Sequence, residues 1–157
     1  LDRDDLLMAV LIGSAIMVPT QFYFSAYSDR NGRKGIFMTG AALTALWAFA
    51  IFPLMASGSF ILAIIAIAVG LTFLGMMYGP QAAFFAELFS TEVRYSGASL
   101  GYQLGAIIGG SFAPIIATLL WKNYDIFWVS VYIAFASILS LISVYMLTET
   151  FQSDLNK

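Results

Sequence analysis

The stretch at residues 25–35 reads SAYSDRNGRKG, and it forms a short charged segment between two apolar runs. The runs are residues 6–27 and 35–56, and each has about the 20 mainly apolar residues that a helix needs to cross a bilayer. Gly32 allows a left-handed backbone turn at no steric cost. A link this short forces its two helices to run antiparallel. The segment therefore predicts a helical hairpin in a membrane, with its charges at one membrane surface.

Three further apolar runs follow the hairpin, at residues 60–85, 96–120 and 126–147. The whole chain is 61% hydrophobic and 10% charged, whereas soluble domains are about 45–50% apolar and about 25% charged. Too few polar residues are present to cover a soluble fold. We therefore expect an all-α membrane protein with about five transmembrane helices and with lipid as its surrounding partner.

The absent residue types exclude several kinds of chemistry. The chain contains no cysteine and no histidine, so we expect no disulfide, no thiolate or imidazole metal site, and no Ser/His/Asp or Cys/His catalytic group. We expect no cofactor, no metal and no enzyme activity. The net charge is −2 and no basic patch is interleaved with aromatic residues, so nucleic acid is not an expected partner.

The basic residues divide unevenly between the two expected membrane surfaces. One surface carries Arg30, Arg33, Lys34, Arg94 and Lys157, and the other carries Arg3 and Lys122. The positive-inside rule assigns the first surface to the cytoplasm. We therefore expect the N-terminus of this chain outside the cell and its C-terminus inside. No charge falls at an expected bilayer midplane, where charges usually mark ion or proton pathways.

Two strips of small residues lie on the third and fourth runs, at four-residue spacing. Residues four apart share one face of a helix, and in lipid such strips let helices approach closely. We expect close helix contacts at Gly75 and Gly79 on the third run, and at Gly97, Gly101, Gly105 and Gly109 on the fourth. The partner of either strip can lie in this chain or in missing sequence.

Polar residues near the middle of two spans are candidates for a substrate cavity. Tyr78 and Gln81 flank the Gly79-Pro80 pair, and Gln103 lies on the following run at a comparable depth. Their hydroxyl and amide groups could contact a substrate. An amide that bonds a neighbouring helix is the alternative, and the sequence leaves both open.

Residues 25–35 resemble the loop signature G-x-x-x-D-R-x-G-R-[RK] of the major facilitator superfamily, with Ser25 in place of the leading glycine. Residues 87–97, ELFSTEVRYSG, are similar to the segment that follows the tenth helix in that superfamily. The resemblance implies a charge network that gates transport. Its members here would be Asp29, Arg30, Gly32, Arg33, Lys34, Glu87 and Arg94.

Residues 78–117 resemble the metabolite:proton symporter family within this superfamily. The resemblance implies a twelve-helix carrier of two six-helix bundles, which moves a small organic acid or osmolyte with protons by alternating access. On that basis the five spans are part of the C-terminal bundle, about helices eight to twelve, and the missing N-terminal helices are partners. The expected location is the bacterial cytoplasmic (inner) membrane.

A different reading is a self-contained five-helix protein that scaffolds or assembles membrane partners through its glycine faces and transports nothing. An intramembrane enzyme has little support, because no nucleophile and base pair is visible within the spans.

Overall fold

The computed structural model describes residues 2–146, and every element in that part of the chain is an α-helix. The helices are α1 (Arg3–Asn31), α2 (Arg33–Ala56), α3 (Phe60–Leu88), α4 (Arg94–Asn123) and α5 (Ile126–Tyr145). All five are long and apolar enough to cross a membrane. The expected all-α membrane fold is confirmed.

Each uninterrupted apolar run forms one helix, and a short polar link separates it from the next. The expected runs at 6–27, 35–56, 60–85 and 96–120 each lie inside one helix, which extends them by up to a few residues at either end. The fifth run was expected to reach residue 147, which lies outside the described residues. At the start of α3 the Ser59 hydroxyl accepts a hydrogen bond from the Leu62 amide at 3.4 Å, as an N-cap residue does.

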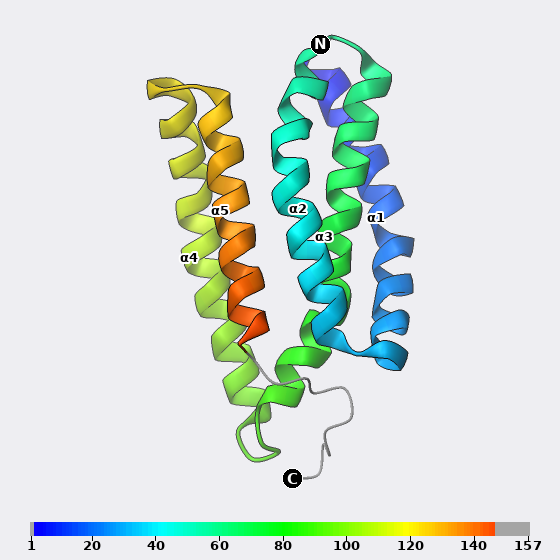
Figure 1. Cartoon of the computed structure of the whole chain (residues 1–157), viewed down its shortest axis with the longest axis vertical. Helices are drawn as coiled ribbons and strands as arrows, with labels where there is room; N and C mark the ends of the chain where they lie inside the picture. Colours follow the sequence, from blue (N-terminus) through cyan, green and yellow to red (C-terminus); the bar gives the residue numbers. More distant parts are fainter. Residues whose placement is uncertain (1, 147–157) are drawn as a thin grey trace.

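The helices are arranged so that α3 packs against both α1 and α2, α2 packs against α5, and α5 contacts α4 (Figure 1). The α1–α2 and α3–α4 links lie at the lower end of the view, and the α2–α3 and α4–α5 links lie at the upper end. The charged turn and the start of α4 therefore share one end of the molecule.

Small side chains form much of the core, so the helices can approach closely. Ala9 on α1 packs with Ala63 on α3, and both are fully buried. A second cluster joins Ala45 and Ala48 of α2 to Ala134 of α5. In a bilayer, close packing of this kind is a main source of helix association.

A third cluster lies toward the end that carries the charged turn. It joins Phe37 of α2, Phe84 of α3 and Val144 of α5. The rings of Phe37 and Phe84 have centroids 6.5 Å apart, within the range of favourable aromatic pairs. This apolar cluster fixes α2, α3 and α5 beside the polar groups described below.

The two expected glycine strips behave differently. A Cβ placed on Gly79 would lie 2.9 Å from the Gln21 carbonyl oxygen and 3.0 Å from the Ser25 amide nitrogen, so α3 and α1 meet backbone to backbone there. Gly75 faces the same helix at ordinary contact distance. The strip on α3 is therefore a close helix contact, and its partner is α1.

The strip on α4 does not pack against a helix within the described residues. A Cβ on Gly97 would meet the Phe89 ring at 2.6 Å, but at Gly101, Gly105 and Gly109 it would meet no atom within 4 Å. No residue of α4 is buried. Among residues 2–146, α4 touches the rest of the bundle only lightly and leaves open space in front of its glycines. Close contacts along this strip stay a prediction, because the expected partner can lie in sequence outside this chain.

Candidate functional site

A single glycine makes the turn between α1 and α2. Gly32 has φ 108° and ψ 149°, a combination with positive φ that is essentially restricted to glycine. Its amide donates to the Ser28 carbonyl at 3.0 Å, which closes the last turn of α1. The backbone is more extended than the left-handed turn expected from the sequence, and it lets α2 begin immediately at Arg33.

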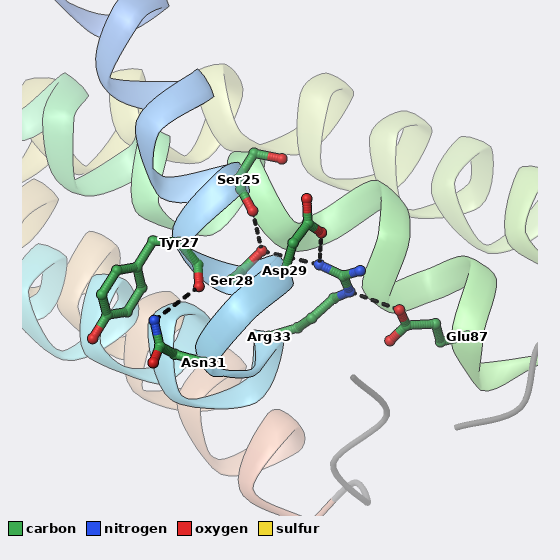
Figure 2. A network of polar contacts seen from close by, with 7 residues as sticks. All are labelled: Ser25, Tyr27, Ser28, Asp29, Asn31, Arg33 and Glu87. Atoms are coloured by element: carbon green, nitrogen blue, oxygen red, sulfur yellow. Dashed lines mark hydrogen bonds and ion pairs between the residues drawn. The ribbon is translucent and has the colours of Figure 1, made fainter. Parts of the chain in front are cut away.

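Arg33 is the centre of a polar network at this turn (Figure 2). Its Nε donates to the Glu87 carboxylate at 2.8 Å. One of its terminal nitrogens forms an ion pair with Asp29 and donates to the Ser28 hydroxyl at 3.1 Å. The Ser28 hydroxyl in turn donates to the Ser25 carbonyl at 2.7 Å. The network therefore ties the end of α1, the start of α2 and the end of α3 together.

The two carboxylates of the network lie in different surroundings. The Glu87 side chain is 6% exposed and the Arg33 side chain is 11% exposed, whereas the Asp29 side chain is 59% exposed. Ser28 is fully buried. Since water screens exposed ion pairs strongly, the Arg33–Glu87 pair is the stronger structural link.

Lys34 points to a different helix from Arg33. Its ammonium donates to the Tyr145 carbonyl at 2.8 Å and lies 5.4 Å from the centre of the Tyr145 ring. Carbonyls at the end of a helix lack partners within the helix, so a cation is favourable there. Consecutive basic residues thus connect α2 to α1 and α3 on one side and to α5 on the other.

Two expected members of the charge network lie apart from it. The Arg94 Nε donates to the Ala86 carbonyl at 2.7 Å, and no ion pair of Arg94 occurs among residues 2–146. The link between α3 and α4 turns back on itself, which brings the guanidinium to the end of α3. Arg30 also forms no ion pair within the described part of the chain.

The substrate-cavity candidates divide between two hollows on α3 and α4. Tyr78 and Gln81 line a hollow of about 480 Å³, together with Phe85 and Tyr102. Its remaining wall consists of small residues of α4: Gly101, Gly105, Ala106, Gly109 and Gly110. Gln103 instead lines a neighbouring hollow of about 240 Å³, which Phe85 and Tyr102 border as well.

Sequence reasoning missed Tyr102, although helical spacing could have found it. Tyr102 precedes Gly105 by three residues and Gly109 by seven, so it shares their face of α4. Gln103 is one position further along and points about 100° away, because a helix has about 3.6 residues per turn. The four-residue spacing of the glycines predicts a packing surface, and that prediction gives no weight to the tyrosine on the same face.

The fold and the site define a helical membrane protein in which a buried ion pair holds the basic turn between α1 and α2. Residues 2–157 match the family model of the Major Facilitator Superfamily. The chain belongs to this superfamily and is an integral membrane protein.

Relatives with known names agree with this family. The chain is 39% identical over 145 residues to the inner membrane metabolite transport protein YhjE of Escherichia coli, covering 92% of this chain and 32% of the relative. It is 29% identical over 148 residues to the shikimate transporter of Escherichia coli, covering 91% of this chain and 33% of that protein. It is 26% identical over 147 residues to the ectoine/proline transporter ProP of Corynebacterium glutamicum, covering 93% of this chain and 29% of that protein.

The chain spans about a third of the length of these relatives. No solved structure matches it significantly.

Proposed function

We propose that this chain is part of a secondary transporter that moves a small organic metabolite across the bacterial inner membrane by alternating access. The relatives are named as transport proteins, which favours a transporter over an enzyme or a scaffold. One of them is named as an inner membrane protein. The observation that carries the proposal is the Arg33 network, which connects three helices at a single membrane surface.

We assign the five helices to the C-terminal bundle, as about the eighth to the twelfth of twelve. The motif match at residues 25–35 and the Glu87 segment support this order, because two helices, α2 and α3, separate the first motif from the second. The chain matches about a third of each relative, which is compatible with five helices out of twelve. In this assignment the first seven helices complete the translocation pathway.

The Arg33 network acts as a gate in this proposal. It ties α1 to α2 and α3, so these helices move together as one body at this end of the bundle. Lys34 adds α5 to the same body through the Tyr145 carbonyl. A body of this kind can rock against the other half of the carrier, as alternating access requires.

The orientation follows from the distribution of charge. Arg33, Lys34 and Arg94 lie at the end of the molecule that carries the α1–α2 turn, whereas Lys122 lies at the opposite end (Figure 1). The positive-inside rule places the first end in the cytoplasm. The N-terminus of the chain is then outside and its C-terminus inside.

Proton coupling, if it drives uptake, uses a carboxylate outside these five helices. The acidic residues of the described part lie in links or within a few residues of helix ends: Asp2, Asp4, Asp5, Asp29, Glu87, Glu92 and Asp125. None lies near the middle of a helix. A coupling acid and an arginine for a substrate carboxylate therefore belong to the preceding helices.

Uptake by the full-length carrier in proteoliposomes tests the proposal. We expect accumulation of a radiolabelled metabolite when an inward proton gradient is imposed, and loss of accumulation when a protonophore is added. A carrier that moves no small metabolite, with or without a gradient, contradicts transport and favours the scaffold. Uptake that ignores the protonophore contradicts proton coupling alone.

A further inference from the structure

Trp47 lies well inside the membrane-spanning helix α2, away from both of its ends. Tryptophan in membrane proteins gathers at the two membrane surfaces, because its ring is apolar and its N–H group needs a polar partner. Here the Trp47 indole nitrogen donates to the Ala66 carbonyl of α3 at 2.9 Å. The Trp47 ring also meets the Phe73 ring edge-on, with centroids 6.1 Å apart. A directional hydrogen bond therefore joins α2 to α3 within the span.

The absence of a side chain at Gly70 opens the Ala66 carbonyl to this bond. On a helix, a side chain covers the turn that precedes its own Cα, so a side chain at position 70 would lie over the carbonyl of residue 66. A Cβ on Gly70 would lie 3.4 Å from the Trp47 Cδ1 and 3.6 Å from its Nε1, so the indole lies against the glycine. A carbonyl oxygen has two lone pairs, and the Ala66 oxygen can accept the indole N–H besides its bond within α3.

A second close contact between α2 and α3 lies nearer the charged turn. Gly40 of α2 is buried, and a Cβ there would lie 2.9 Å from the Met76 Cβ and 3.0 Å from the Phe73 carbonyl oxygen. A glycine lets the helices approach closely but makes no directional side-chain bond. The hydrogen bond of Trp47 can therefore fix how far α2 lies along α3, which the contact at Gly40 does not do.

Seven-residue spacings place these contacts on the same helix faces as the Arg33–Glu87 ion pair. The residues at this spacing are Arg33, Gly40 and Trp47 on α2, and Ala66, Phe73, Pro80 and Glu87 on α3. Seven residues are nearly two turns of about 3.6 residues, so each series stays close to one face of its helix. The Trp47 bond and the ion pair therefore hold the same seam between α2 and α3.

We infer that Trp47 is a positioning residue for the Arg33–Glu87 ion pair. Its bond to Ala66 fixes the position of α2 along α3, and this position brings the Arg33 Nε to 2.8 Å from the Glu87 carboxylate. Both bonds join two helices of this chain, so further helices of the carrier need not supply a partner. The consequence for transport rests on the proposed function, in which the ion pair belongs to the gate.

A packing role for Trp47 alone is the alternative. Trp47 lies two seven-residue spacings from Arg33 along α2, about 21 Å at 1.5 Å per residue. Changes at sites this far apart usually have additive effects on stability, unless something couples the sites. Non-additive effects would therefore report the shared position of α2 along α3, and additive effects would report packing alone.

Thermal unfolding of the full-length carrier in detergent tests the inference. Replacing Trp47 by 3-benzothienylalanine keeps the shape of the ring and puts sulfur in place of the N–H group. The comparison background carries Arg33→Met together with Glu87→Leu, because replacing both partners of a buried ion pair by apolar residues is tolerated better than removing one. The same replacement at Trp121, which lies on α4, is the matched control.

We expect the analogue at position 47 to lower the unfolding midpoint at least about twice as far when the ion pair is present as when it is absent. The reason is that the lost hydrogen bond also weakens the ion pair. The control should shift the midpoint equally in both backgrounds.

Equal shifts for the analogue at position 47 in the two backgrounds, or an unchanged midpoint, would overturn the inference and leave Trp47 a packing residue. The measurement needs no transported solute. A carrier that takes up no metabolite would therefore refute the proposed function and leave the positioning role of Trp47 standing, so the two failures are distinguishable.

Discussion

At the scale of single residues, Arg33 has two carboxylate partners whose surroundings differ greatly. The Glu87 side chain is almost fully buried, and the Asp29 side chain is more than half exposed. Removing one partner of a buried ion pair leaves an uncompensated charge, whereas an exposed pair contributes little. The sequence motif draws attention to Asp29, but the structure makes Glu87 the more important partner for stability.

This difference predicts unequal losses of stability. In the full-length carrier we expect Glu87→Ala to lower the free energy of unfolding by about 3–5 kcal/mol, and Asp29→Ala to lower it by about 0–1 kcal/mol. Thermal unfolding in detergent measures both. Glu92→Ala, which removes an exposed acid from the α3–α4 link, is the control. Equal destabilisation by the Asp29 and Glu87 variants would show that burial does not rank the two pairs.

At the scale of helices, the α1–α3 contact depends on the absence of a side chain at Gly79. An added Cβ would press against backbone atoms of Gln21 and Ser25, which cannot move aside as a flexible side chain could. We expect Gly79→Ala to destabilise the full-length carrier by about 1–3 kcal/mol, the usual effect of overpacking.

Gly35→Ala is the matched control for this substitution. It lies on α2, and a Cβ there would meet no atom within 4 Å. Its unfolding transition should stay close to that of the unmodified carrier. If the Gly79→Ala carrier also unfolds at the same temperature as the unmodified carrier, the close backbone contact between α1 and α3 does not form in the full-length protein.

The sequence predicts the positions of the helices well, but it does not predict which helices contact one another. Uninterrupted apolar runs predict the helices, because a span in lipid must satisfy its own backbone hydrogen bonds. A strip of small residues predicts close approach but does not name the partner, so the contact of Gly79 with α1 came only from the structure. The α4 strip faces a hollow instead. The path of the α3–α4 link, which places Arg94 against Ala86, has no sequence pattern that predicts it.

At the scale of the whole molecule, the charged turn and the α2–α3 link lie at opposite ends (Figure 1). The chain contains no cysteine, so single cysteines within it report on chosen positions. We expect Asn31→Cys to react with a membrane-impermeant maleimide only from the cytoplasmic side, and Ser57→Cys only from the outside. The background is a carrier otherwise free of cysteine, and labelling is done in intact cells and in inverted vesicles. Reversed labelling would contradict the proposed orientation.

In the proposed function, the Arg33 network gates the transport cycle. Lysine at this position keeps the charge but lacks the planar fork that bonds Glu87, Asp29 and Ser28 together. The most direct measurement is the initial rate of metabolite uptake by full-length Arg33→Lys carrier in proteoliposomes, at a membrane abundance matched to the unmodified protein. We predict a rate at least about tenfold lower, a barrier change of about 1.4 kcal/mol. An unchanged rate at equal abundance would show that the Arg33 network does not gate transport.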